Sequence, residues 1–382
     1  MKPPSDGAPS ICFVGLNNLP ALAPEFRHLP MGGAELQQTL LAKGLARAGF
    51  QVSMVVADLG QPDGTTWSGV RTFKAFGPDA GLPGLRFVHP RWTGVWAALK
   101  RANATIRYCS CAGLLPGQLA LFTRSHPGKV VFRIAHDSDC HPDKLLIPNW
   151  RAKTLYRYGI KHVDLILAQS ETQRVDMRRN FGRDSRVIPS MLEPSLENRE
   201  FDDRDIDVLW VSNIRPFKRP DLALDWATQS PAITLHMIGG TQPDSLAYFD
   251  EVKQRAASIP NVRFHGPKPY DEVNAHMART RVFANTSDTE GFPNTYLQAW
   301  ARGTPVVGFF DPDGVIAREG LGRTVHNIGE MHAAIQEFLT NRELWMAVSR
   351  RCREYVEARH GGGALKQYID ALLSLERTSV AA

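Results

Sequence analysis

The sequence predicts an α/β protein built from two doubly wound parallel-sheet domains in tandem, which face a central cleft. Three observations predict this class. The chain has 382 residues, and at about 150 residues per domain two domains are expected. Short apolar runs alternate with amphipathic stretches of helical period, which is typical of parallel strands covered by helices on both faces. A polar, acidic, proline-containing stretch over residues 191–207 separates two such series and is typical of an interdomain linker.

The first half of the chain contains the first series. A helix is expected over residues 33–48, because Leu36, Leu40 and Leu41 share one face at helical spacing and Leu45 continues it. The expected strands are SICFVGL from Ser10, QVSMVVA from Gln51, KVVFRIAH over 129–136, VDLILAQS over 163–170 and SRVIPS over 185–190.

The second half repeats the pattern. Its expected strands are VLWVSN, ITLHMIGG, VRFHGP, RVFANTS and PVVGF, and helical sequence dominates from about residue 330. We therefore expect a first domain over 1–195, a second over 205–360, and a C-terminal helix over 361–382 that crosses back to the first domain. Ligands of such folds bind beyond the carboxyl ends of the strands.

Composition narrows the class of protein. Hydrophobic residues make up 43% and charged residues 22%, which excludes intrinsic disorder. No apolar run approaches the ~18 residues of a membrane span, and the N-terminal sequence lacks a signal-peptide core. The five cysteines form no disulfide framework, so a cytoplasmic location is expected. Residues 1–190 carry 24 Lys and Arg against 13 Asp and Glu, whereas 191–382 carry 21 against 26. A basic first half suits phosphates, anionic lipid or nucleic acid, or serves solubility alone.

The strongest local signal is ANTSDTEGFPNTYLQAWARGTPVVGF, from Ala284. A strand leads into a loop, and Pro293 suits the first turn of the following helix. Glu290 therefore precedes a helix N-terminus, where free N–H groups favour an anion such as a diphosphate. Gln298 lies about two turns into this helix, on the face that begins at Asn294. Glu290 is also explained by its preference for the positive end of a helix.

Other candidates follow other strands. Arg215 and Lys218 come after VLWVSN and would stabilise negative charge on a leaving group, or form an ordinary solvated basic turn. Gly32 and Gly33 open the first helix without forming a dinucleotide-binding or P-loop fingerprint. Strand-end loops that let the backbone approach a flat base closely contain Gly239, Gly240, Gly266, Pro267 and Lys268.

FRIAHDSDCH, from Phe132, places His136 at the end of a predicted strand. The same segment permits two metal sites, which the sequence alone leaves open. One is a carboxylate pair, Asp137 and Asp139, although Asp311-Pro-Asp313 repeats that pattern trivially. The other is a zinc site from Cys140, His141 and the pair Cys109 and Cys111.

The segment EGFPNTYLQAWARGTPVV resembles the E-x7-E region of the retaining glycosyltransferases of family 4, which have the GT-B fold. The turn at Arg215 and Lys218 resembles the family's phosphate-binding turn, and GGAE at the first helix resembles the family's donor-facing loop. The resemblance covers nearly the whole chain. It implies that Glu290 holds donor-sugar hydroxyls and that Gln298, where the family usually has a second Glu, holds the ribose. It also implies that His136 lies near the reacting carbon and that no metal is required.

The resemblance therefore predicts an enzyme that transfers a sugar, with retention, from a UDP- or GDP-linked donor to a glycan, glycolipid or other acceptor. The catalytic residues would be His136, Glu290, Arg215 and Lys218. The expected donor-binding residues are Gly32, Gly33, Arg215, Lys218, Gly239, Gly240, Pro267, Lys268, Glu290, Gly291, Phe292, Pro293, Asn294, Thr295 and Gln298. Two alternatives are a non-catalytic nucleotide-sugar-binding relative, motivated by Gln298, and a nucleic-acid-binding protein, which we disfavour because no recognition motif is present.

Residues 86–108 mix Trp92, Trp96 and Leu99 with arginines and lysines. Such a stretch forms either a membrane-interface helix or, more often, a helix with one core face. We expect peripheral contact with an anionic membrane at its inner face. The irregular stretch over 61–91 is expected to be a loop region that contributes acceptor specificity.

Overall fold

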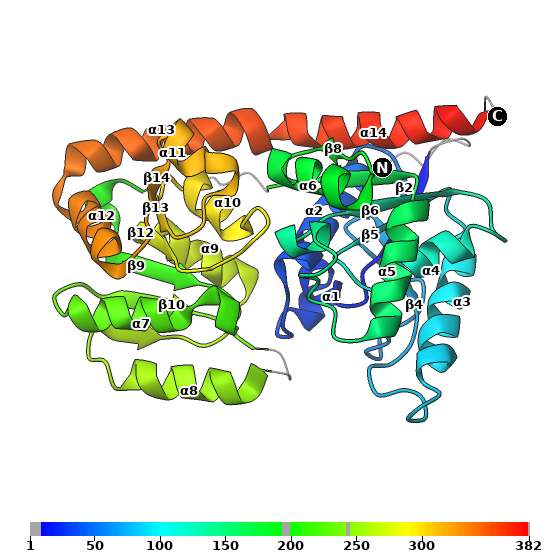
Figure 1. Cartoon of the computed structure of the whole chain (residues 1–382), viewed down its shortest axis with the longest axis horizontal. Helices are drawn as coiled ribbons and strands as arrows, with labels where there is room; N and C mark the ends of the chain where they lie inside the picture. Colours follow the sequence, from blue (N-terminus) through cyan, green and yellow to red (C-terminus); the bar gives the residue numbers. More distant parts are fainter. Residues whose placement is uncertain (1–8, 193–198, 242–244, 381–382) are drawn as a thin grey trace. The chain divides into compact units, whose positions relative to one another are not determined.

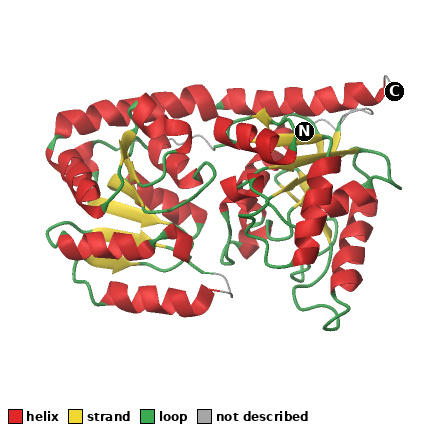
Figure 2. Cartoon of the chain, in the orientation of Figure 1, coloured by secondary structure: helices red, strands yellow, loops and turns green. Residues whose placement is uncertain are grey.

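The structure, a computed structural model, describes residues 9–192, 199–241 and 245–380. The chain separates into two compact units, Met1–Met191 with Gly362–Ala382, and Leu192–Gly361. Each unit is a mainly parallel sheet with helices on both faces (Figures 1 and 2), so the prediction of two parallel-sheet α/β domains is confirmed. The linker expected over 191–207 lies partly outside the described residues.

The first unit contains an eight-stranded sheet in the order β3-β4-β2-β1-β5-β6-β7-β8. All neighbouring strands are parallel except β3 and β4. The strand order reverses between β1 and β5, which makes this the topological switch point of the sheet. The strands are β1 (Ser10–Val14), β2 (Gln51–Val56), β3 (Thr66–Trp67), β4 (Val70–Lys74), β5 (Ile106–Ser110), β6 (Lys129–Arg133), β7 (Leu165–Ala168) and β8 (Arg186–Val187).

Helices cover this sheet because each buries one apolar face. α14 belongs to this unit, since its Tyr368, Ala371 and Leu372 share a core cluster with Leu41 and Leu45 of α2. The α-helices are α1 (Leu19–Leu22), α2 (Gly33–Arg47), α3 (Thr93–Ala102), α4 (Leu115–Phe122), α5 (Trp150–His162), α6 (Glu171–Phe181) and α14 (Gly362–Val380). The shorter turns are η1 (Pro24–Phe26), η2 (Phe87–Trp92) and η3 (Asp137–Cys140).

Two sequence predictions about this unit are wrong. Residues 86–108 are not one helix, because α3 ends at Ala102, where Asn103 adopts a left-handed conformation with φ 45°, and β5 then begins at Ile106. The stretch over 61–91 is not all loop, because it contains β3 and β4. β4 was missed because Arg71 interrupts its apolar residues.

The second unit contains a six-stranded parallel sheet in the order β11-β10-β9-β12-β13-β14, with its switch point between β9 and β12. Its strands are β9 (Ile206–Val211), β10 (Leu235–Ile238), β11 (Val262–Phe264), β12 (Thr280–Asn285), β13 (Val306–Gly308) and β14 (Gly322–Thr324). Its helices and turns are η4 (Phe201–Asp203), η5 (Pro216–Lys218), α7 (Pro220–Gln229), α8 (Leu246–Ala257), α9 (Tyr270–Ala278), α10 (Asn294–Ala301), η7 (Pro312–Gly314), α11 (Val315–Glu319), α12 (Ile328–Thr340) and α13 (Arg342–His360).

A buried arginine anchors the start of the second sheet. Arg204 is fully buried, and its guanidinium donates to the carbonyls of Arg199, Thr280 and Arg302. It also lies 4.6 Å from the ring centroid of Trp345. Burial lowers the pKa of Arg204 to about 9. These contacts join the segment before β9 to α13 and to the loops around β12 and β13, because a buried cation requires this many partners.

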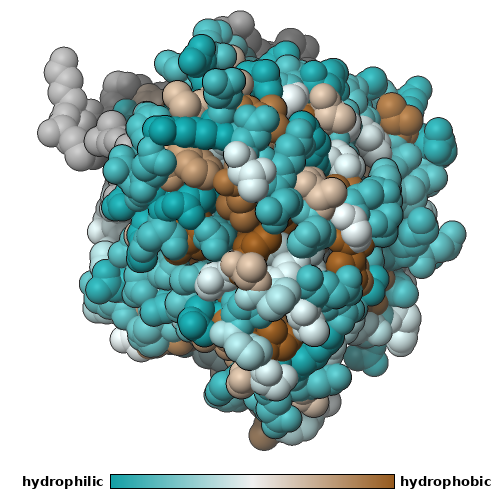
Figure 3. All heavy atoms as spheres, turned by 90° about the vertical axis from the view of Figure 1, so that its left-hand side faces the viewer, coloured by the Kyte–Doolittle hydropathy of each residue, from teal (hydrophilic) through white to brown (hydrophobic). Residues whose placement is uncertain are grey.

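The surface and the cysteines agree with the composition. The side drawn in Figure 3 is mostly hydrophilic, with apolar side chains in small separate groups. Within the described ranges, no helix combines the length and apolar character that a membrane crossing requires. All five cysteines are free thiols.

Candidate active site

The loops that follow β9 and β12 meet at the switch point of the second sheet. Trp210 donates its indole N–H to the Thr286 hydroxyl at 2.9 Å, and that hydroxyl lies 3.0 Å from the carbonyl oxygen of Lys218. The Asp288 amide donates to the Phe217 carbonyl at 2.9 Å. The η5 turn is therefore fixed against the loop that leads to α10.

The central interaction of this site is an ion pair between Lys218 and Glu290. Lys218 Nζ lies 2.5 Å from Glu290 Oε2, and the two side chains are only 15% and 11% exposed. Ser287 donates its hydroxyl to the other carboxylate oxygen, Oε1, at 2.7 Å. Because both charges are largely removed from water, each depends on the other for compensation. The two strand-end motifs found in the sequence are thus joined through their side chains.

Glu290 lies just before the N-terminus of α10. Pro293 is the N-cap, one residue earlier than its predicted place inside the first turn, and it supplies no side-chain acceptor for the first amides. The intervening Phe292 anchors the loop through ring contacts with Trp300 and His360. Gly291, Asn294 and Thr295 belong to the same short segment and are buried or partly buried. The positive end of α10 is therefore next to the Lys218–Glu290 pair.

Arg215 is held in the same loop system. It is the N-cap of η5 and is partly buried. The amide of the preceding residue, Ile214, donates to the Gly240 carbonyl at 2.7 Å, and the Gly239 amide donates to the Gly266 carbonyl at 3.0 Å. The loops after β9, β10 and β11 are therefore connected in series along the carboxyl edge of the sheet.

Glycine is required at two of these positions. A Cβ on Gly239 would lie 2.1 Å from the Ser212 carbonyl oxygen, which no side chain permits. Gly266 has φ +67°, in the left-handed region that favours glycine. The close approach of these backbones depends on the absence of side chains.

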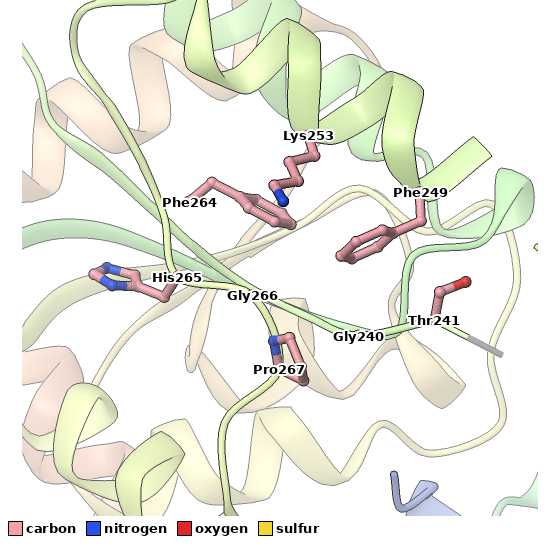
Figure 4. A pocket seen from close by; sticks show the side chains of 8 residues that line it. All are labelled: Gly240, Thr241, Phe249, Lys253, Phe264, His265, Gly266 and Pro267. Carbon is pink, nitrogen blue, oxygen red and sulfur yellow. The ribbon is translucent and has the colours of Figure 1, made fainter. Parts of the chain in front are cut away.

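A pocket of 490 Å³ opens beside these glycines (Figure 4). Figure 4 shows Phe249 and Lys253, from α8, near Phe264 at the end of β11, with the two phenyl rings in edge contact at 5.8 Å. The lining residues are Gly240, Thr241, Phe249, Lys253, Phe264, His265, Gly266 and Pro267. Lys268, which was expected here, pairs with Glu272 at 2.9 Å and does not line the pocket. Phe249 and Lys253 were not among the predicted residues, although their i, i+4 spacing places them on one helix face.

Three histidines lie beside this pocket. His265 Nε2 is 3.0 Å from His236 Nδ1, and the rings of His265 and His276 are 5.1 Å apart. Burial, followed by repulsion from His265 and His276, lowers the pKa of His236 to about 4. Burial also lowers the pKa of His265. Neutral imidazoles are therefore favoured at His236 and His265, where one ring nitrogen donates and the other accepts.

Gln298 faces a neighbouring helix. It is 4% exposed, and its amide nitrogen donates to Asn274 Oδ1 of α9 at 2.9 Å. Its backbone carbonyl accepts from Arg302 at 3.1 Å. The residue that replaces the family's second Glu is thus part of a buried amide pair between α9 and α10.

In the first unit, His136 follows β6 and is the N-cap of η3. Its Nδ1 accepts from the Ser138 amide at 3.1 Å, and its own amide donates to Asp139 Oδ2 at 3.2 Å. Burial raises the pKa of Asp139 to about 6, although backbone amides around it oppose this shift. This reciprocal capping fixes the backbone and ring orientation of His136.

Neighbouring elements complete this edge of the first sheet. Arg133, three residues before His136, is buried; it donates to the Ser190 hydroxyl at 3.0 Å and stacks on Tyr368 at 5.3 Å. Gly32 is the N-cap of α2, and Gly33 is its first residue. The Asn18 amide donates to the Glu35 carbonyl within the first turn of that helix at 3.1 Å.

The two metal sites that the sequence left open are not assembled. Asp139 accepts backbone amides, His141 Nε2 lies 3.0 Å from Asp176 Oδ2, and the Cys140 thiol is directed to the Gln173 carbonyl. Across the part of the chain that the structure describes, no three His, Cys, Asp or Glu side chains are grouped as a metal ion requires.

Comparisons with known proteins agree with this architecture. The family model described as Glycosyltransferase Family 4 matches residues 31–196, and that described as Glycosyl transferases group 1 matches residues 205–341. Among solved structures, sucrose-phosphate synthase from Thermosynechococcus elongatus is similar with a TM-score of 0.79 at 17% identity, covering 98% of this chain and 100% of that one. Anabaena Alr3699/HepE in complex with UDP and glucose is similar with a TM-score of 0.71 at 16% identity, covering 96% and 99%.

The two sheets with their switch points, together with these structural neighbours, place the protein in the class of GT-B glycosyltransferase folds. A curated relative, D-inositol 3-phosphate glycosyltransferase from Frankia alni, is 33% identical over 117 residues, a match that spans 28% of this chain and 29% of that protein. With both family models matched in succession, the chain belongs to the group 1 glycosyltransferases with a family 4 N-terminal domain.

Proposed function

We propose that the protein is a metal-independent, retaining glycosyltransferase that takes a sugar from a UDP- or GDP-linked donor. The observation that supports this most strongly is the buried Lys218–Glu290 pair beside the N-terminus of α10. It combines a cation, an acceptor for hydroxyl groups and the positive N-terminus of a helix within one strand-end site. A diphosphate attached to a sugar requires these three kinds of partner.

In this proposal the site works through an exchange of partners. When the donor binds, Lys218 turns from Glu290 to the diphosphate, and the released carboxylate accepts hydrogen bonds from sugar hydroxyls. The bond between the anomeric carbon and the phosphate oxygen breaks, and its electron pair leaves with the diphosphate. The acceptor hydroxyl bonds to the same face of that carbon, and its proton passes to the oxygen of the departing diphosphate. Arg215, Lys218 and the α10 amides stabilise the leaving charge, an effect worth about 3–4 kcal/mol per well-placed donor.

The remaining roles follow the family pattern. The base would occupy the pocket between Gly240 and Phe264, where carbonyl groups of uracil or guanine would meet the Lys253 amine. His136 would act at the reacting carbon from its fixed position after β6. The acceptor would be a glycan or a lipid-linked glycan, reached on the cytoplasmic side in peripheral contact with an anionic membrane. The structure named Alr3699/HepE, which binds UDP and glucose, supports a nucleotide-sugar donor.

One observation favours a second candidate, a non-catalytic nucleotide-sugar-binding protein. Gln298 is buried against Asn274, so its amide is already occupied where the family usually presents a carboxylate to the ribose. Such a protein would bind nucleotide sugars and release no diphosphate.

The test is a thermal-shift panel of UDP-, GDP- and other nucleotide sugars, followed by product analysis. We expect one base class to stabilise the wild type, and Arg215→Ala to abolish this stabilisation. Arg350→Ala is the matched control, because it removes an exposed arginine of the same unit on α13. NMR of the product should show the anomeric configuration of the donor, and EDTA should leave the rate unchanged.

Three results would count against the proposal. If no nucleotide sugar stabilises the protein, the proposed donor class is wrong. If the product has the inverted anomeric configuration, the proposed retaining mechanism is wrong. Tight nucleotide binding without transfer to any glycan or glycolipid acceptor would favour the non-catalytic alternative.

A further inference from the structure

The first unit exposes a group of large apolar side chains that its fold does not require. Leu82, Leu85 and Val88 are 70%, 65% and 58% exposed, and Leu146 and Trp150 are 60% and 72% exposed. These are the five most exposed large apolar residues among those that the structure describes. They come from only two short segments, one before α3 and one at the start of α5. Single exposed apolar residues are ordinary, whereas such concentration marks an interaction surface.

The two segments are neighbours. The Arg151 guanidinium lies 5.9 Å from the ring centroid of Phe87 and 5.6 Å from that of Trp150, so it bridges the segments. α3, α4 and α5 run along one edge of this unit (Figure 1), and Trp96 of α3 packs on Phe122 of α4 at 5.4 Å. The exposed residues therefore belong to one surface, which we call the apolar edge: Leu82, Leu85, Val88, Leu146 and Trp150.

Buried neighbours hold these side chains outward. Leu145 and Ile147 are 7% and 5% exposed, so the extended chain between them turns Leu146 to solvent. On the other segment, Trp92 contacts Phe87 at 6.1 Å, and its carbonyl accepts from the Gln118 amide at 3.2 Å. The apolar edge is thus supported from beneath by the core of the unit and is not a frayed loop.

Cations surround the apolar edge. Residues 79–91 and 143–157 contain six Arg and Lys but only two Asp and Glu. Arg86, Arg91, Lys144 and Arg151 are all exposed. Apolar side chains between long cationic ones suit a lipid surface, where leucine and tryptophan enter the interface and the cations meet anionic headgroups.

A protein partner fits this surface less well. A standard protein interface buries about 800 Å² on each partner over 20–30 residues, with charged residues depleted at its centre. The apolar edge has five apolar residues with cations interspersed among them. Its positive charge is complementary to anionic lipid, and this complementarity favours a membrane over a protein as the binding partner.

We propose that the apolar edge is the membrane-docking surface of this protein and that its partner is a bilayer containing anionic phospholipid. This inference deepens the peripheral contact proposed above and rests on it. It also moves that contact away from α3, because Val95, Ala98 and Leu99 are buried, as expected for the alternative of a helix with one core face.

The experiment is flotation of the full chain with phosphatidylcholine vesicles, with and without phosphatidylglycerol, at low and high salt. We expect binding only to the anionic vesicles and weakening by salt. L85S/W150S should reduce the bound fraction at least tenfold, and R86S/R151S should reduce it while removing the salt dependence. L246S/M346S is the matched control, because it removes two exposed apolar residues of the second unit and should bind like wild type.

Several results would overturn the proposal: no binding of wild type at low salt, equal binding to both vesicle types, or L85S/W150S binding like wild type. Self-association without lipid that L85S/W150S abolishes would assign the surface to a second copy of the chain instead. L82S, at another exposed position, serves as a second variant if L85S/W150S loses its folded circular dichroism. The test needs no nucleotide sugar, so its failure leaves the donor proposal standing, and thermal shifts by nucleotide sugars report on that proposal separately.

Discussion

The Lys218–Glu290 pair allows a quantitative test of the site in the absence of any ligand. Removing one partner of a fully buried ion pair costs about 3–5 kcal/mol, because the other charge is left uncompensated. The side chains of Lys218 and Glu290 are 15% and 11% exposed, so water partly solvates the charge that remains and reduces this cost. We therefore expect Lys218→Met or Glu290→Gln to lower the free energy of unfolding by about 2–4 kcal/mol. Glu290→Gln keeps an acceptor for the Ser287 hydroxyl, so most of its loss comes from the isolated ammonium.

The double variant separates the interaction from its surroundings. In Lys218→Met with Glu290→Gln, neither charge is left alone, and we expect about 1.5–3 kcal/mol of the summed losses to be recovered. The measurement is urea unfolding followed by circular dichroism and fitted with one transition for each unit of the chain. Losses that add within about 0.5 kcal/mol would mean that the Lys218–Glu290 pair is not formed in solution.

The same variants separate binding from stability. If the proposed roles hold, the double variant should regain stability without regaining the thermal shift by nucleotide sugars, because the diphosphate would lose its ammonium partner and the sugar its carboxylate partner. If nucleotide binding returned together with stability, Lys218 and Glu290 would be purely structural.

Three further predictions follow from single contacts. Arg204→Met should lower the free energy of unfolding by at least about 3 kcal/mol, because three backbone carbonyls lose their buried donor. The control Arg350→Met should change it by less than about 0.5 kcal/mol. Equal effects of the two substitutions would contradict the anchoring role of Arg204. Gln298→Glu should lower the free energy of unfolding by about 1 kcal/mol, because Asn274 must rotate its amide to become the donor. Calorimetry should show nucleotide binding that is unchanged or tighter. A variant that no longer binds would mean that the glutamine has another role. The free energy of unfolding should fall as the pH drops from about 6.5 toward 4, because His236 is protonated in the unfolded chain but stays neutral in the folded one. The loss should be on the order of 1–2 kcal/mol, because His236 is partly exposed. His236→Gln should flatten that part of the pH profile of stability.

The sequence predicted the sheets well because their strands are buried on both faces. Runs such as ICFV in β1 and VLWV in β9 contain no outward polar alternation, which is typical of strands in a parallel sheet between two helix layers. The short or mixed strands were missed because they contain no continuous apolar run. β14 is three residues of Gly, Arg and Thr, whose position is fixed by pairing with β13 and not by apolar periodicity.

The residues of the candidate site that directly follow strands could be predicted from the sequence. The contacts that form between separate helices could not. The motifs around Arg215 and Glu290 both follow strands, and the fold brings these strands together at a switch point. No spacing rule, however, connects Gln298 to Asn274, or Phe249 to Phe264 in the pocket, because these contacts form only when separate helices pack. Family resemblance supplied roles for the residues and no information about these partners.

The discontinuity of the first unit affects how the chain becomes a protein during synthesis. Tyr368, Ala371 and Leu372 close a core cluster whose other members precede Met191, and the whole second unit is translated between them. Until α14 leaves the ribosome, α2 keeps an uncovered apolar face and Arg133 lacks the ring on which it stacks. The strand end next to His136 is therefore completed after the second unit, and a chain released before Tyr368 would carry a finished second unit and an unfinished first one.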